Sequence, residues 1–278
     1  RSMIGTVIGD WEGSIRDARA AYADASAIGN RTVLAEAAMY TGYGSLGAGR
    51  IADVAPALDE ARELATGTTD FMRCLAMSVK ALLLFITGDL AAGIALTEES
   101  LATQRRRNDC EGGGLTLSFL AQMTFAKGDL QRAMKLYGEA LDTFGKVGDK
   151  PEIARVYCEL GWAALAAKEV QVAKGAFQTA VRCYEEVGSA RGTGLALMGL
   201  AAVDAADGHP ERAITIAQAA TAYSARTGVV IEHAMDPGVV ARIDALKESI
   251  PKRTLDNLLQ NADALTPSQV LAMVAEAT

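Results

Sequence analysis

The sequence has few aromatic residues and no long uncharged apolar run. Phe, Trp and Tyr make up 5% of its 278 residues, although half of the chain is hydrophobic. Alanine supplies much of that hydrophobic share, which suits closely packed helices better than strands. The most apolar stretch, ALLLFI at 81–86, is far shorter than the roughly 20 residues that a membrane-spanning helix needs. We therefore expect an all-α protein that is cytoplasmic and does not enter a membrane.

Cysteine and histidine are also scarce. The four cysteines have no CxxC spacing, and the two histidines lie far apart without clustered Cys or carboxylate residues. These patterns argue against a zinc site and against a disulfide framework. The sequence contains no Ser/His/Asp set, no glycine-rich phosphate loop and no paired carboxylates at a plausible cleft. We expect no catalytic residues, no metal and no cofactor, and we do not expect an enzyme.

Positive charge is in deficit as well. The 27 Lys and Arg residues are outnumbered by 34 Asp and Glu residues, which gives a net charge of −7. An acidic chain is repelled by the phosphate backbone of nucleic acids, so we expect no direct nucleic-acid binding.

The chain does contain a regular repeat. A glycine recurs at intervals of 39 or 40 residues, with a lysine in one of the slots, and a fixed period of this size is typical of arrays of two-helix units. The six slots are Gly9, Gly49, Gly88, Gly128, Lys168 and Gly208.

Three columns of small residues keep the same phase. Seven residues before each slot stand Ser2, Gly42, Ala81, Ala121, Gly161 and Ala201. Five residues after it stand Ser14, Val54, Gly93, Ala133, Ala173 and Ala213, of which only Val54 is larger. Twelve residues after it stand Ala21, Ala61, Ser100, Ala140, Ala180 and Ala220. Small residues at fixed positions let two helices cross closely.

The repeated glycine is expected at the turn between the two helices of each unit. There it can end the first helix with positive φ, and the aspartate that follows it in three units can cap the second. These aspartates are Asp10, Asp89 and Asp129. Bulkier residues, such as Leu120, Tyr137, Leu160 and Phe177, would fill the gaps between helices.

This pattern resembles the tetratricopeptide repeat (TPR). The best match is YCELGWAALAAKEVQVAKGAFQTAV at 157–181, where Leu160, Gly161, Ala173, Phe177 and Ala180 fall on signature positions. The resemblance implies a superhelical array of about six TPR-like helix pairs over residues 1–230. The unit is about 40 residues long, which resembles the long-repeat branch found in scaffold and regulator proteins. Ser2 already falls on the eighth position of the first unit, so we expect that unit to lack most of its first helix and the chain to be a fragment of a longer polypeptide.

A different pattern occupies residues 231–278, where we expect capping helices that cover the end of the array. Thr266, Pro267 and Gln269 form a predicted capping box before an apolar face. Together with the preceding repeat, this segment resembles the C-terminal arm of large bacterial signal-transduction ATPases and LuxR-type transcription regulators, such as the maltose-type activators. The chain shows no Walker A motif and no helix-turn-helix. The resemblance therefore implies a sensor or scaffold arm.

The first helix of each unit should line a groove. Residues at fixed offsets from the small residue predict an apolar, partly aromatic stripe that consists of Met39, Tyr43, Leu82, Phe85, Gln122, Phe125, Cys158, Trp162 and Met198. The leading hypothesis is a protein-interaction or effector-sensing arm that binds a protein or peptide there. The alternative is a receptor for a small effector, enclosed between the groove and the C-terminal cap. Packing of these residues inside the array, and self-association through a terminal repeat, also remain open.

One charged and glycine-rich stretch is expected to be a loop. QRRRND at 104–109 and EGGG at 111–114 lack an apolar periodicity, which predicts a solvated connection between helices. A more specific hypothesis than a solvated loop is that the arginines of this stretch contact an acidic partner.

Overall fold

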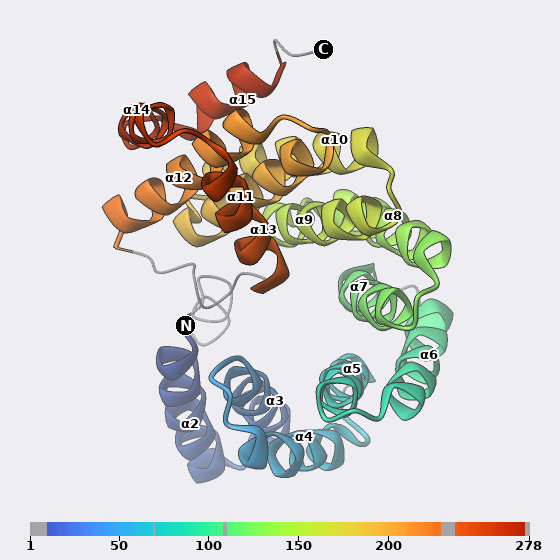
Figure 1. Ribbon diagram of the computed structural model, residues 1–278. Helices are drawn as coiled ribbons and strands as arrows, with labels where there is room; N and C mark the ends of the chain where they lie inside the picture. The colour runs from blue at the N-terminus through green and yellow to red at the C-terminus, as the bar shows by residue number, and fades with distance from the viewer. Residues whose placement is uncertain (1–9, 69, 108–109, 229–236, 276–278) are drawn as a thin grey trace. The chain divides into compact units, whose positions relative to one another are not determined.

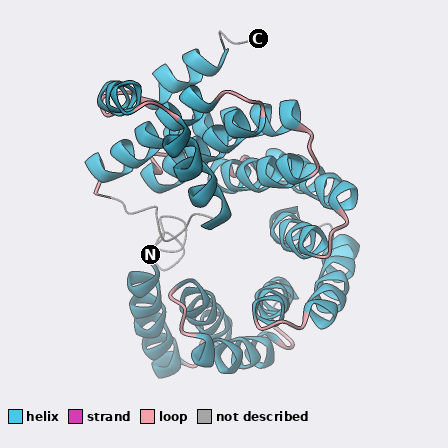
Figure 2. Cartoon of the chain, in the orientation of Figure 1, coloured by secondary structure: helices cyan, strands magenta, loops and turns pink. Residues whose placement is uncertain are grey.

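The computed structural model describes residues 10–68, 70–107, 110–228 and 237–275. These residues form 14 helices and no strand (Figures 1 and 2). The chain divides into two compact units, residues 1–147 and 148–278. The fold class is therefore all-α, as predicted, and each unit is described by itself below.

The described residues of unit 1 form the helix α2 followed by three helix pairs. Helix α2 spans Trp11–Ile28. The pairs are α3 (Arg31–Gly47) with α4 (Ile51–Ala65), α5 (Asp70–Ile86) with α6 (Leu90–Arg107), and α7 (Cys110–Ala126) with α8 (Leu130–Val147). The first helices of the pairs pack side by side, α3 on α5 and α5 on α7. The prediction that the first unit lacks most of its first helix falls on residues 1–9, which lie outside the described residues.

Unit 2 contains two further pairs and three C-terminal helices. The pairs are α9 (Lys150–Ala166) with α10 (Val170–Glu186) and α11 (Ala190–Ala206) with α12 (Pro210–Arg226). The C-terminal helices are α13 (Pro237–Ser249), α14 (Lys252–Ala262) and α15 (Pro267–Ala275). α9 packs on α11, so the first helices again lie next to each other. The division predicted at residue 230 falls inside this unit, between its repeats and its C-terminal helices.

The predicted turn geometry is confirmed at every slot that the structure describes. Gly49, Gly88, Gly128 and Gly208 have φ between 73° and 98°, and Lys168 also lies in this left-handed region with φ 64°. The Oδ1 atoms of Asp10, Asp89 and Asp129 accept hydrogen bonds from the backbone N–H three residues later, at 2.9, 3.1 and 3.2 Å. A second glycine series that the sequence analysis did not use, including Gly148, Gly188 and Gly228, ends the second helices in the same conformation.

The small-residue columns are buried as expected. Every described member of the first two columns is buried, and so are five of the six in the third, with Ala21 half-buried. Tyr137, Phe177 and Leu120 fill the spaces between helices with almost no exposed surface, whereas Leu160 is half-buried. Close helix contacts therefore explain why these positions exclude bulk.

Lys168 provides a test of the turn geometry. Replacing it with glycine is expected to raise the free energy of unfolding by about 1 kcal/mol, because glycine adopts positive φ without the steric cost of a Cβ atom. Urea denaturation followed by circular dichroism measures the change. Lys168→Ala is the matched control, since alanine keeps the Cβ and removes the lysine chain. Equal unfolding midpoints for the glycine and alanine variants would contradict the prediction.

The loop predicted over residues 104–114 is wrong. α6 continues to Arg107, and α7 begins at Cys110, so only residues 108–109 lie between the helices. Gly112, Gly113 and Gly114 are buried inside α7. A Cβ atom on Gly114 would lie 2.9 Å from the ring of Phe144 on α8, which explains the glycine there by close helix approach rather than by a turn.

The C-terminal helices pack against the last repeat. Thr266 and Gln269 form the predicted capping box, with N–H···O distances of 2.9 and 3.3 Å, and α15 begins at Pro267. α13, α14 and α15 all contact α12. Gln218 on α12 donates to Asp263 at 2.7 Å, and Arg226 Nη2 donates to the Leu265 carbonyl at 3.0 Å. Ala262, Val270 and Val274 are buried in these contacts. These helices therefore form a C-terminal cap on α11 and α12.

Candidate functional site

The predicted groove residues all lie on the first helices of their pairs. Unit 1 carries Met39 and Tyr43 on α3, Leu82 and Phe85 on α5, and Gln122 and Phe125 on α7. Unit 2 carries Cys158 and Trp162 on α9 and Met198 on α11. Helical spacing within each element places the members of each set on one side of the helix.

In unit 1, five of the predicted groove residues lie on adjacent helices and keep part of their surface exposed. Tyr43, Leu82, Phe85, Gln122 and Phe125 are all half-buried, and their helices α3, α5 and α7 are adjacent. Tyr43, Leu82 and Phe85 pack their inner surfaces on the hydrophobic core. We call these five residues the groove stripe; three of them pack on the core, and all five keep part of their surface exposed.

Three of the predicted residues contribute almost nothing to an exposed surface. Met39 is completely buried in the core of unit 1, and Cys158 and Met198 are buried in unit 2. The pKa of the Cys158 thiol is raised to about 12, mainly by burial and also by the neighbouring Glu159, while a hydrogen bond with Trp162 acts in the opposite direction. The thiol is thus kept protonated at neutral pH, which makes Cys158 a packing residue and a poor nucleophile.

Trp162 has both a structural and a surface-facing part. Its ring lies edge-on to Phe177 of α10, with centroids 5.0 Å apart and an interplanar angle of 74°. Phe177 is completely buried, whereas Trp162 is only half-buried. The indole therefore supports the core with one edge and leaves the remainder available for contact.

A charged cluster beside Trp162 was missed by the sequence analysis. Arg155 donates to Glu152 Oε2 and to Glu159 Oε1, both at 2.6 Å, and all three side chains are about one-quarter exposed or less. Burial raises the pKa of the Glu159 carboxyl, and the positive charge of Arg155 opposes that shift. The spacing of three and four residues places the cluster on one face of α9, and this spacing was the available sequence signal.

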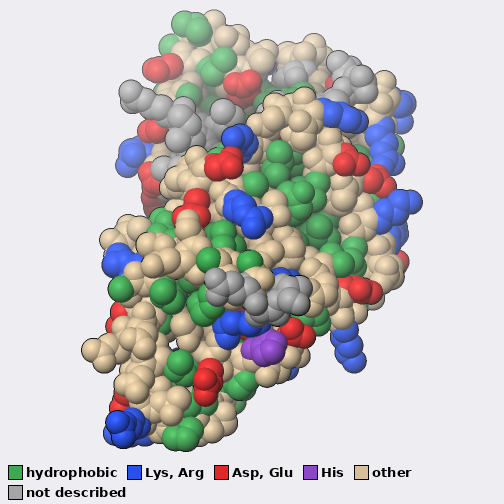
Figure 3. Space-filling view, turned by 90° about the horizontal axis from the view of Figure 1, so that it is seen from above, with side chains coloured by type: hydrophobic (Ala, Val, Ile, Leu, Met, Phe, Trp, Pro, Cys, Tyr) green, Lys and Arg blue, Asp and Glu red, His purple; other side chains and the backbone are tan. Residues whose placement is uncertain are grey.

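The face shown in Figure 3 carries side chains of both charge signs. In Figure 3, Lys and Arg side chains are interspersed with Asp and Glu over the face in view. Within the described ranges, no group of three or more His, Cys, Asp or Glu residues could hold a metal ion. No helix in the described part of the chain is long and apolar enough to cross a bilayer.

The chain resembles known proteins in sequence over part of its length and in fold over most of it. The tetratricopeptide-repeat profile matches residues 114–186, which include the segment 157–181. No curated protein matches the sequence.

Solved structures agree with the fold. BtubC (BKLC) from P. vanneervenii has a TM-score of 0.64 at 18% identity, over 78% of this chain and 92% of that one. A protein of Podosopora anserina assigned as a kinesin light chain, with nearly identical TPR-like repeats, has a TM-score of 0.55 at 17% identity, over 71% of this chain and 98% of that one. At these identities the likeness concerns the fold. The chain thus has the fold of TPR-like helix repeats, and residues 114–186 carry the tetratricopeptide-repeat sequence pattern itself.

Proposed function

We propose that the chain is a protein-interaction or effector-sensing scaffold arm of a bacterial regulatory protein, and that it binds a protein or peptide on the groove stripe. The observation that carries the proposal is the stripe itself. Five half-buried and mostly apolar side chains lie along three adjacent first helices of unit 1. The regulatory setting is supported by the resemblance of the C-terminal segment to bacterial regulators.

The groove stripe favours an amphipathic helical partner. Such a partner presents apolar anchors three or four residues apart, and it gains affinity by burying them against apolar and aromatic side chains. Leu82, Phe85 and Phe125 offer apolar surface, while Tyr43 and Gln122 carry polar groups that can fix the partner's orientation. Because Tyr43, Leu82 and Phe85 already pack on the core, these three side chains would lose little conformational entropy on binding.

Phe125→Ala tests the proposal. Amphipathic helical peptides are selected by display against the wild-type chain, and their affinities are then measured one by one by fluorescence anisotropy. We expect the variant to weaken binding by about tenfold or more, as truncation of a central aromatic anchor commonly does.

Val147→Ala is the matched control, because Val147 is a large apolar residue at the end of the second helix α8, which carries no groove-stripe residue, and 49% of its surface is exposed. It is expected to leave the affinities unchanged. Peptides that bind wild type, Phe125→Ala and Val147→Ala equally would contradict the proposal. The small-effector receptor stays a prediction, and saturable binding of a metabolite without peptide binding would support it instead.

A further inference from the structure

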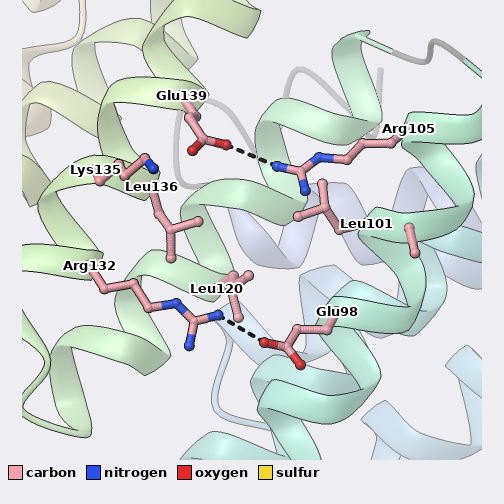
Figure 4. A pocket seen from close by; sticks show the side chains of 9 residues that line it. Glu98, Leu101, Arg105, Leu120, Arg132, Lys135, Leu136 and Glu139 are labelled. Atoms are coloured by element: carbon pink, nitrogen blue, oxygen red, sulfur yellow. Dashed lines mark hydrogen bonds and ion pairs between the residues drawn. The ribbon is translucent and has the colours of Figure 1, made fainter.

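A second concave site lies on the other helices of unit 1, away from the groove stripe. It is a pocket of about 360 Å³ between the second helices α6 and α8, with α7 beneath them (Figure 4). Its floor consists of Leu101, Leu120 and Leu136, each from a different one of these helices and each buried. The volume lies within the range of about 300–1,000 Å³ that is usual for small-molecule sites.

Two ion pairs form opposite sides of the rim. Arg132 on α8 donates to Glu98 on α6, and Arg105 on α6 donates to Glu139 on α8, both at 2.9 Å. The pairs have opposite polarity across the pocket, as Figure 4 shows. Each carboxylate therefore already has a cationic partner.

Lys135 supplies a cation that these carboxylates do not neutralise. It lies on α8 between Arg132 and Glu139, and its ammonium is directed toward the pocket (Figure 4). No salt bridge to Lys135 occurs among the residues that the structure describes. The lining therefore carries three cationic side chains against two carboxylates, which leaves one positive charge above an apolar floor.

We infer that this pocket binds a small organic monocarboxylate with a compact apolar body. The apolar body would cover the three leucines, and the carboxylate would accept hydrogen bonds from Lys135 and from the free guanidinium edges of the rim. An amine would be repelled by the excess positive charge. A polyphosphate would lose its hydration over the leucine floor with only one spare cation in return.

The bound molecule would touch two adjacent repeats at once. The floor and rim join α6 of one repeat to α7 and α8 of the next. A ligand that binds only the folded arrangement stabilises it more as the ligand concentration rises above its Kd, so it favours the spacing of these two repeats that the pocket requires.

Leucine-methyl NMR of the full chain tests the inference with three matched probes: phenylpropionate, phenylpropanol and phenylpropylamine. We expect phenylpropionate to shift the methyl signals of Leu101, Leu120 and Leu136 saturably. The alcohol should bind about fivefold more weakly, because it lacks the charge–charge term of an exposed pair, and the amine should bind more weakly still.

Two lysine variants separate the carboxylate contact from general charge. Lys135→Met is expected to lower the affinity for phenylpropionate about fivefold and to leave phenylpropanol binding unchanged. Lys146→Met removes another exposed lysine of α8 and should change neither. The inference is overturned if phenylpropionate does not saturate these methyl shifts, or if both variants bind it like wild type. Peptide binding to the groove stripe is measured on different residues, so its success or failure is independent of this result.

Discussion

Replacing Arg212 with methionine is expected to lower the free energy of unfolding by about 3 kcal/mol. Arg212 on α12 forms a two-point ion pair with Asp204 on α11, with Nε–Oδ2 and Nη2–Oδ1 distances of 2.5 and 2.7 Å. The Asp204 side chain is only 2% exposed and that of Arg212 is 16% exposed. Removal of the guanidinium would strand a carboxylate in a medium that hydrates it poorly. The value lies at the lower end for a buried pair because Arg212 keeps some contact with water.

Chemical denaturation of three variants isolates this effect. The double variant Asp204→Leu with Arg212→Met should recover most of the loss, since it removes the unpaired charge. Lys150→Met breaks the exposed pair between Lys150 and Glu186, whose N–O distance is 2.8 Å, and should leave the unfolding curve nearly unchanged. An Arg212→Met curve that coincides with that of Lys150→Met would show that the α11–α12 pair contributes nothing measurable.

Gly161→Leu is expected to destabilise the protein by about 1–3 kcal/mol through overpacking. A Cβ atom on Gly161 would lie 2.8 Å from the ring of Phe177, and one on Gly199 would lie 2.3 Å from the same ring. The Phe177 ring is thus enclosed by α9 and α11 and completely buried. It has no space into which it can move, so an added side chain must displace a helix.

Gly175→Ala is the matched control for this variant. Gly175 lies on α10 near Phe177 in sequence, but it is exposed, and an added Cβ would meet no atom within 4 Å. Alanine there should stabilise the helix by about 0.5–1 kcal/mol through its higher helix propensity. Both changes are read from thermal melting of the purified chain. Normal melting of Gly161→Leu would refute the close contact between α9 and α10 at this position.

The repeat and its turns were predictable because each depends on short-range chemistry. Each of these features can be recognised from the residue at a single position: a glycine at positive φ, an aspartate that caps the next helix, or a small residue at a close crossing. The 104–114 segment shows where this reasoning fails. Gly114 permits the approach of Phe144, 30 residues later, and a glycine needed for packing looks the same in sequence as one needed for a turn.

How deeply each predicted groove residue is buried could be predicted only in part. Helical spacing places Met39 and Tyr43 on related faces of α3, yet the first is completely buried and the second half-buried. That difference depends on how far apart neighbouring helices stand, which local spacing does not encode. The two ion pairs on the rim of the α6–α8 pocket did leave a signal in the sequence. The two residues of Glu98–Arg132 are as far apart in sequence as those of Arg105–Glu139, and the order of acid and base is reversed.

The order of helix contacts also bears on how quickly the protein folds. Among the helices α2 to α8, and among α9 to α12, each helix packs on its neighbours or next neighbours in sequence. Such contacts close short chain loops, so little entropy is lost before they form, and helical proteins of low contact order fold rapidly. A nucleus can arise at any repeat and grow in either direction. On the ribosome, the earliest repeats can therefore pack before the later ones have been synthesised.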